Sequence, residues 1–192
     1  MTGLVRLASA EHRVDAGFGV EPSAGVLLSL ELAVDLTPRW RLGGWVELGS
    51  LEAKATGAVD RDVGALGVAA SLELRPWLAL VGRAGRRSYS TPLARQGWTT
   101  VSLGAEARVP FANRRVQAVA STALLPVVAV SGLPGPDLAL AAGAGMNYRL
   151  GSASVEARYA LERYDFPRQG AARRLEQLSS LSIALRVPLR RA

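Results

Sequence analysis

The sequence predicts a single all-β domain over residues 1–192: an antiparallel, up-and-down transmembrane β-barrel of ten strands, with eight as the fallback if the first and last strands are frayed. Three observations predict this fold. Apolar residues recur at every second position, the connections between these apolar rows alternate between short and long, and aromatic residues gather at the ends of the rows. No Ser/Pro-rich linker or shift in composition divides the chain, which favours one domain.

The alternation is clearest over residues 25–36, where the apolar row consists of Val26, Leu28, Leu30, Leu32, Val34 and Leu36. Successive side chains of a strand point to opposite faces, so this segment is a strand with one apolar face and one small or charged face. The same pattern returns over residues 65–75, 101–109, 138–148 and 181–189. A soluble, half-buried sheet also alternates, so the period alone does not place the protein in a membrane.

Strands are expected near residues 4–14, 24–36, 40–54, 64–75, 77–89, 98–109, 115–127, 137–149, 152–164 and 178–189. The short connections are residues 37–39, 76, 110–114 and 150–151, and longer ones lie at 15–24, 55–63, 90–97, 129–136 and 165–177. Short turns at one end and longer loops at the other are typical of a transmembrane barrel. The alternation also predicts that both ends of the chain lie on the short-turn side.

Aromatic residues are expected to form two interfacial girdles. Trp40, Trp77 and Tyr148 lie at the short-turn ends of the strands, and Tyr89, Trp98 and Tyr164 lie at the long-loop ends. Trp and Tyr favour both membrane interfaces because their rings are apolar and their N–H or O–H groups seek water. The alternative is that these rings pack at strand ends for reasons unrelated to lipid.

These patterns resemble the small outer-membrane β-barrel proteins of bacteria, the OmpA-like group in the broad sense. The resemblance covers nearly the whole chain and is one of pattern, without a diagnostic peptide. It implies a location in the bacterial outer membrane, with lipid around the apolar rows and the polar row facing a lumen.

The polar row of such a barrel can be written out. The residues expected to face inward are Glu31, Asp35, Glu47, Glu73, Arg75, Arg83, Arg87, Glu106, Arg108, Glu156, Arg158, Glu162 and Arg186. A small barrel has an interior only wide enough for side chains to fill it. We therefore expect an ion-pair network that closes the lumen or leaves a narrow pore, formed by Glu31, Glu47, Glu73, Arg83, Glu106, Arg108, Glu156, Arg158 and Arg186. The alternative is a solvated face of a soluble sheet.

No catalytic, cofactor-binding or metal site is expected. His12 is the single histidine, and Ser9 is three residues away, so the two point to opposite faces of a strand and cannot form a local dyad. Asp60 and Asp62 fall in a long connection and are expected to solubilise it. The chain has no cysteine and no second histidine for a metal site, and no Gly-rich loop ending in Lys-Ser or Lys-Thr for a phosphate.

The chain is strongly basic, with a net charge of +7. Its arginines lie near both ends of the expected strands, where they would meet lipid phosphates, including those of lipopolysaccharide. Nucleic acid is not the expected partner, because no aromatic stacking platform is interleaved with the basic residues. We expect a monomer.

Together these patterns predict a non-enzymatic outer-membrane protein with a structural or surface-interaction role. Two alternatives remain at this stage. One is an outer-membrane enzyme that modifies lipid or peptide. The other is a soluble ligand-binding β-barrel, because residues Met1–Phe18 lack the continuous apolar core of a secretory signal.

Overall fold

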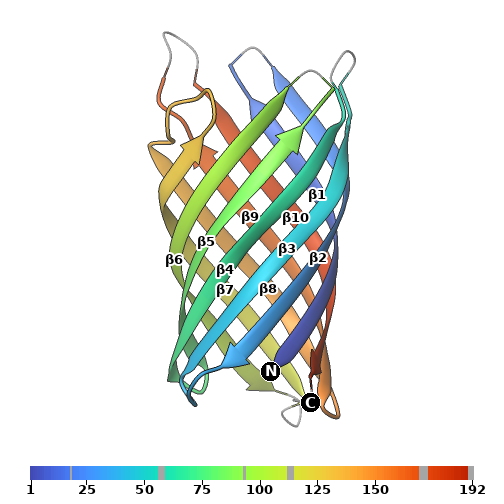
Figure 1. Ribbon diagram of the computed structural model, residues 1–192, viewed down its shortest axis with the longest axis vertical. Helices are drawn as coiled ribbons and strands as arrows, with labels where there is room; N and C mark the ends of the chain where they lie inside the picture. The colour runs from blue at the N-terminus through green and yellow to red at the C-terminus, as the bar shows by residue number, and fades with distance from the viewer. Residues whose placement is uncertain (18, 56–58, 93, 112–114, 169–172, 190–192) are drawn as a thin grey trace.

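The computed structural model describes all residues except 18, 56–58, 93, 112–114, 169–172 and 190–192, and forms a closed antiparallel barrel (Figure 1). Its strands are β1 (Thr2–Asp15), β2 (Val20–Asp35), β3 (Trp40–Ala53), β4 (Arg61–Arg75), β5 (Leu78–Ser90), β6 (Arg95–Phe111), β7 (Val116–Val130), β8 (Leu138–Leu150), β9 (Ala153–Asp165) and β10 (Leu175–Pro188). Each strand pairs with the next along the chain, and β1 pairs with β10 to close the ring. None of the described residues forms a helix long and apolar enough to cross a membrane.

The ten-strand, up-and-down prediction is confirmed, and β1 begins and β10 ends at the short-turn end, where Thr2 is the register partner of Pro188. The strands are longer than expected, mostly at the long-loop end: β2 starts at Val20, β6 at Arg95 and β10 at Leu175. Backbone pairing continues there although the apolar alternation has stopped. Of the expected turn at 110–114, residues 112–114 lie outside the described part of the chain.

Apolar side chains cover the outside of the barrel. Leu66, Leu103 and Ile183 are 63%, 62% and 64% exposed, and the outward rows of the other strands are similarly apolar. Exposed apolar area of this extent is unfavourable in water but matches the lipid-facing band of a membrane barrel. We call this band the belt. Together with the closed ring of strands, it identifies a transmembrane β-barrel.

The belt ends well below the long loops. On β1 the outward row changes from Val5 and Leu7 to Ser9, Glu11 and Arg13, and above Leu181 on β10 it changes to Ser179 and Gln177. A membrane needs only about 9–11 residues of each tilted strand. The upper parts of the strands, including residues 9–15 of β1 and 175–180 of β10, therefore rise beyond the bilayer at the long-loop end of the barrel (Figure 1).

The interior combines small residues with long polar and aromatic ones. A buried cluster at the long-loop end includes Leu51, Tyr89, Trp98, Tyr164 and Phe166. Glycines make room for large side chains elsewhere: a Cβ on Gly85 would lie 2.9 Å from the ring of Trp45. Side chains thus fill much of the barrel, as expected for its size.

Candidate functional site: two side-chain layers across the lumen

Two sets of inward-facing side chains cross the barrel. We call the upper set the mouth layer, and it consists of His12, Glu21, Arg61, Arg87, Tyr89, Trp98, Glu162, Tyr164, Phe166, Arg174 and Glu176. The lower set, the middle layer, consists of Arg6, Glu106, Arg108, Glu156 and Arg158. Every second side chain of a strand points to the same face, and the members of both layers that lie on strands occupy the positions that face the lumen.

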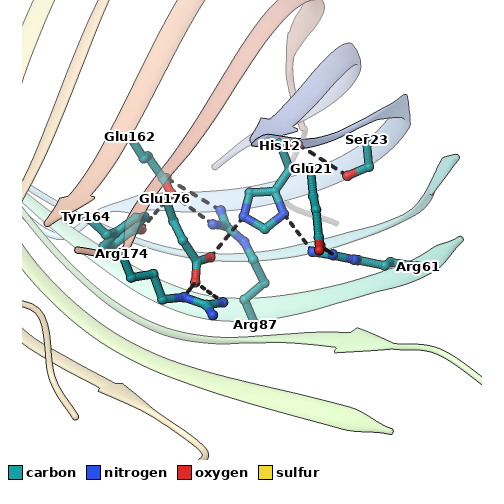
Figure 2. Close-up of polar contacts among 9 residues, drawn as sticks. All are labelled: His12, Glu21, Ser23, Arg61, Arg87, Glu162, Tyr164, Arg174 and Glu176. Carbon is teal, nitrogen blue, oxygen red and sulfur yellow. Dashed lines mark hydrogen bonds and ion pairs between the residues drawn. The ribbon is translucent and has the colours of Figure 1, made fainter. Parts of the chain in front are cut away.

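His12 is buried at the centre of the polar part of the mouth layer (Figure 2). Its Nε2 lies 3.1 Å from Oε2 of Glu176, and its Nδ1 lies 3.4 Å from Nη1 of Arg61. Because a guanidinium can only donate, Nδ1 is the acceptor and Nε2 carries the hydrogen that is donated to Glu176. The imidazole also stacks on Tyr89, with ring centroids 4.9 Å apart and planes inclined by 8°.

Glu176 is fully buried and is held from two sides. Besides His12, Arg174 contacts it, with Nη2 2.6 Å from Oε1. Glu176 lies on the part of β10 above the belt. Burial alone would raise its pKa, but the hydrogen bond from His12 and the positive charge of Arg174 outweigh burial and hold the pKa of Glu176 below its ordinary value. The carboxylate is therefore ionised at neutral pH and anchors both neighbours.

Arg87 and Glu162 connect distant walls of the barrel. Arg87 is on β5 and Glu162 is on β9, with the three strands β6, β7 and β8 between them, and Nη1 of Arg87 lies 2.8 Å from Oε2 of Glu162. Tyr164 donates its hydroxyl hydrogen to the same Oε2 at 2.7 Å. Figure 2 shows these groups beside the His12–Glu176 pair. A charge-assisted bridge therefore spans the lumen at the mouth.

The aromatic part of the mouth layer corrects the expected upper girdle. Tyr89, Trp98 and Tyr164 are only 5%, 3% and 3% exposed, and they face the barrel interior. The ring of Trp98 meets Tyr164 edge-on at 5.0 Å and Phe166 at 6.0 Å. The prediction that these three residues face lipid is wrong, because each stands an even number of residues from an inward-facing charge on its own strand: Arg87, Glu106 and Glu162.

At the other end, Trp40, Trp77 and Tyr148 are exposed beside the short turns, with Trp40 and Tyr148 in the outward rows of β3 and β8. Their role as interfacial anchors stays a prediction. Two aromatic residues outside the expected girdles lie elsewhere: Trp45 faces the lumen, and Tyr159 faces outward within the belt.

The middle layer is built around Glu106. Arg108 on the same strand contacts it at 2.6 Å, and Arg158 from β9 contacts it at 3.1 Å. Arg158 also lies 3.7 Å from Glu156, which Arg6 of β1 approaches to 3.8 Å. The structure thus joins four members of the expected network, and it adds Arg6, which sequence reasoning left out although Arg6 is in phase with Ala8 and His12.

The other expected network residues are placed differently. Glu31, Arg83 and Arg186 line a small lumen cavity of about 60 Å³ beside the middle layer, but none of the three forms an ion pair with another described residue. Glu47 accepts a hydrogen bond from Ser29 at 2.9 Å. Glu73 is exposed near the short-turn rim. The sequence predicted one continuous ion-pair network. The structure instead contains the smaller middle layer, and these other residues lie outside its ion pairs.

A larger cavity of about 250 Å³ lies between the two layers. Its lining includes Arg87, Trp98 and Tyr164 from the mouth layer and Arg6 and Glu106 from the middle layer. Apolar residues such as Leu27 and Leu125 contribute to its wall. The interior is therefore a chamber with side chains crossing the barrel above and below it.

Groups considered for chemistry are not assembled into a reactive centre among the described residues. Ser9 is exposed on the outer face of β1, opposite to the buried His12. Asp60 accepts a hydrogen bond from the backbone N–H of Ala53, and Asp62 is exposed on β4. No three described His, Cys, Asp or Glu side chains are grouped so that they could hold a metal ion.

Comparison with known proteins identifies the fold. No protein family and no curated protein matches the sequence. The structure is similar to the outer membrane protease OmpT from Escherichia coli, with a TM-score of 0.62 and 9% identity over 98% of this chain and 96% of that one. It is also similar to the translocator domain of the autotransporter NalP from Neisseria meningitidis, with a TM-score of 0.52 and 11% identity over 98% and 88% of the two chains.

At this identity the comparison establishes architecture alone. The neighbours are bacterial outer-membrane barrels, and this chain shares their closed antiparallel ring. Its apolar belt provides the surface that a bilayer covers. The protein is therefore a transmembrane β-barrel of the outer-membrane type, which supports its expected location in the bacterial outer membrane.

Proposed function

We propose that this protein is a non-enzymatic outer-membrane barrel with a structural or surface-interaction role, OmpA-like in the broad sense, whose lumen does not conduct. The observation that carries the proposal is the pair of layers across the lumen. The Arg87–Glu162 bridge, together with the packed rings of Trp98 and Tyr164, occupies the mouth, and the Glu106–Arg158 pair occupies the middle. Open aqueous channels are usually built from about sixteen strands.

The main alternative is an outer-membrane enzyme. The buried His12–Glu176 pair near the loops favours it, and OmpT, a structural neighbour, is named as a protease. In this chain, however, Glu176 and Arg61 occupy the two ring nitrogens of His12, and Tyr89 covers one ring face. A general base needs a free nitrogen within reach of a substrate proton. These contacts support a structural role for His12.

We also propose that the outside of the barrel binds outer-membrane lipid, including lipopolysaccharide phosphates, and that the protein is a monomer. Arginines lie on the outer face above the belt, among them Arg86 and Arg95. Guanidinium groups bind phosphate oxygens through paired hydrogen bonds, which supports this partner.

Ion conductance in a planar lipid bilayer tests the closed lumen. The wild-type protein is expected to give no steady current. A variant with the mouth layer opened (Arg87→Ala with Trp98→Ala) and one with the middle layer opened (Glu106→Ala with Arg158→Ala) should each stay closed, because the other layer remains. The variant that combines all four changes should conduct.

The matched control is Glu73→Ala, which removes an inward-row charge at the rim and touches neither layer. A steady current through the wild-type protein would contradict the proposal. So would a combined variant that inserts, keeps the electrophoretic mobility of a folded barrel and still does not conduct. Turnover of peptide or lipid that is abolished in His12→Ala would favour the enzyme.

A further inference from the structure

Two arginines on the outer face of the barrel pair with no carboxylate in the part of the chain that the structure describes. Among the described residues, four strand arginines face outward towards the long loops: Arg13, Arg86, Arg95 and Arg163. Arg13 pairs with Glu11 at 2.8 Å and Arg163 with Asp165 at 3.4 Å, each two residues away on the same strand. Arg86 and Arg95 form no ion pair with any described residue, although they lie on the adjacent strands β5 and β6.

The two guanidinium groups converge on one cross-strand pair, Ser88 and Gly97. Nη2 of Arg95 donates a hydrogen bond to Oγ of Ser88 at 3.4 Å. Nη2 of Arg86 lies 3.7 Å from the point where a Cβ on Gly97 would stand, and Oγ of Ser131 lies 3.1 Å from the same point. Two cations and two hydroxyl groups therefore surround the space above a residue that has no side chain.

This convergence is electrostatically unfavourable without an anion, since like charges repel and no described carboxylate forms an ion pair with either arginine. The outward carboxylate on the next strand is Asp62 of β4, the register partner of Ser90, and it forms no ion pair with either arginine. Three donor groups face outward here without a protein anion among the described residues: the guanidinium groups of Arg86 and Arg95 and the hydroxyl of Ser131. The Ser88 hydroxyl donates its hydrogen to the carbonyl oxygen of Gly64 at 3.3 Å and accepts from Arg95, so it orients Arg95. The arrangement is suited to a phosphate.

The position of the site indicates where the anion comes from. Arg86 is the register partner of Leu66 on one side and of Thr99 on the other, and Leu66 is one of the most exposed residues of the belt. An arginine on the outer face is tolerated at the membrane boundary but is strongly unfavourable at the midplane of the bilayer. The site therefore lies where the headgroups of the surrounding lipids begin.

We propose that Arg86, Arg95 and Ser131 bind the phosphate of a membrane-lipid headgroup, with the acyl chains of that lipid lying on the belt below. Ser88 positions Arg95 by accepting its hydrogen bond. A phosphomonoester carries close to two negative charges at neutral pH, which matches the two arginines. Gly97 leaves room for the phosphate oxygens. The inference locates the lipid binding proposed above at one site and rests on it, and it is independent of whether the lumen is closed.

Lipid titration of the purified protein in an uncharged maltoside detergent, read out by native mass spectrometry, tests the site. Phosphatidic acid offers the phosphomonoester, phosphatidylcholine a zwitterionic phosphodiester, and diacylglycerol no phosphate. Phosphatidic acid should bind most tightly, and the Arg86→Gln/Arg95→Gln variant should lose about ten- to hundredfold in affinity for it. The affinity of the Arg86→Lys/Arg95→Lys variant for phosphatidic acid should lie between those of the wild type and the double Gln variant, because lysine keeps the charge but cannot form the paired hydrogen bonds of a guanidinium.

Two further variants separate the site from general charge and from folding. Arg163→Gln, which removes an outward arginine that is already paired, should bind phosphatidic acid like the wild type. Gly97→Val changes no charge but fills the space beside Ser131, so it should weaken the binding of phosphatidic acid. Valine is β-branched and suits a strand, so this variant should still fold. Folding is checked by the heat-sensitive electrophoretic mobility typical of a closed barrel.

The proposal is overturned if the double Gln variant and Gly97→Val bind phosphatidic acid as tightly as the wild type, if diacylglycerol binds equally well, or if Arg163→Gln loses as much affinity. Displacement of the lipid by inorganic phosphate at matching concentrations would assign the site to a free anion and reject the lipid. Conductance of the wild-type protein would refute the closed lumen alone and leave the lipid site standing.

Discussion

Arg87 of β5 and Glu162 of β9 form an ion pair across the barrel mouth, with Nη1 and Oε2 2.8 Å apart, and Tyr164 donates to the same carboxylate oxygen. Strands that are not neighbours in the ring are thereby connected by side chains, in addition to the backbone ladders that connect each strand to the next. This bridge is the clearest evidence that side-chain contacts of the mouth layer hold the barrel walls together.

Removal of one partner of this bridge should destabilise the barrel. Arg87→Ala leaves the half-buried Glu162 without its guanidinium, and a loss of about 1–3 kcal/mol in the free energy of unfolding is expected. Thermal unfolding in detergent measures this loss. The double variant Arg87→Ala/Glu162→Ala should be less destabilised than the sum of the single variants, because both partners are then gone. Strictly additive effects would mean that the two residues do not interact.

Glu176 should make stability depend on pH in the acid range. Its pKa is lower in the folded protein than in the unfolded chain, so its contribution is fully present above the ordinary glutamate value of about 4.3 and is lost as the pH falls through the folded-state pKa. The stability difference between wild type and Glu176→Gln should therefore shrink below about pH 4.3. The control Glu52→Gln alters an exposed carboxylate and should show no such trend. A difference that stays constant with pH would contradict the assignment.

Glu106 should matter more than Arg108 in the middle layer. Glu106→Ala removes the carboxylate that both Arg108 and Arg158 contact, whereas Arg108→Ala leaves the Arg158 contact in place. Both variants should melt at lower temperature in detergent while still inserting into membranes, and the loss should be larger for Glu106→Ala. Glu73→Ala, at an exposed position, should stay within about 0.5 kcal/mol of the wild type. Unchanged melting of Glu106→Ala would remove the ion-pair argument for this layer.

Gly143 should be needed for the position of Arg158. A Cβ at residue 143 would lie 3.0 Å from Nε and 3.1 Å from Nη2 of Arg158, and 3.1 Å from Oγ of Ser121. Gly143→Ala should displace the guanidinium and reproduce part of the loss seen in Arg158→Ala. The two changes combined should therefore cost less than their sum in a thermal-unfolding cycle. Full additivity would show that Gly143 acts through the backbone alone.

The strand alternation was sufficient to predict the fold. Rows such as Val26 to Leu36 specify which face meets lipid, because shifting a strand by one residue would turn its whole apolar row inward. The alternation of short and long connections then predicts the up-and-down order. The strand ends at the long loops could not be predicted, since above the belt both faces can be polar and the pattern ends before the backbone pairing does.

The contacts of the site were predictable only in part. Tyr164 lies two residues from the inward-facing Glu162, and Tyr89 two from Arg87, so the same alternation that predicts the lumen charges also places these rings inside. Their expected lipid-facing role conflicted with that alternation. The choice of ion-pair partner, by contrast, could not be predicted from the alternation. Arg158 on β9 contacts Glu106 on β6 across the lumen, and that distance depends on the geometry of the whole barrel, which the sequence of a single strand does not encode.

The orientation of the apolar rows is the central claim, and quenching of a single site-attached fluorophore tests it most directly. The chain has no cysteine, so Leu103→Cys, within the belt, and Glu52→Cys, on the outer face above it, can each carry one small bimane label. In vesicles, a brominated phospholipid should quench the label at 103 strongly, and aqueous iodide should quench the label at 52. Quenching at 103 by iodide, with no effect of the brominated lipid, would contradict a membrane-embedded belt.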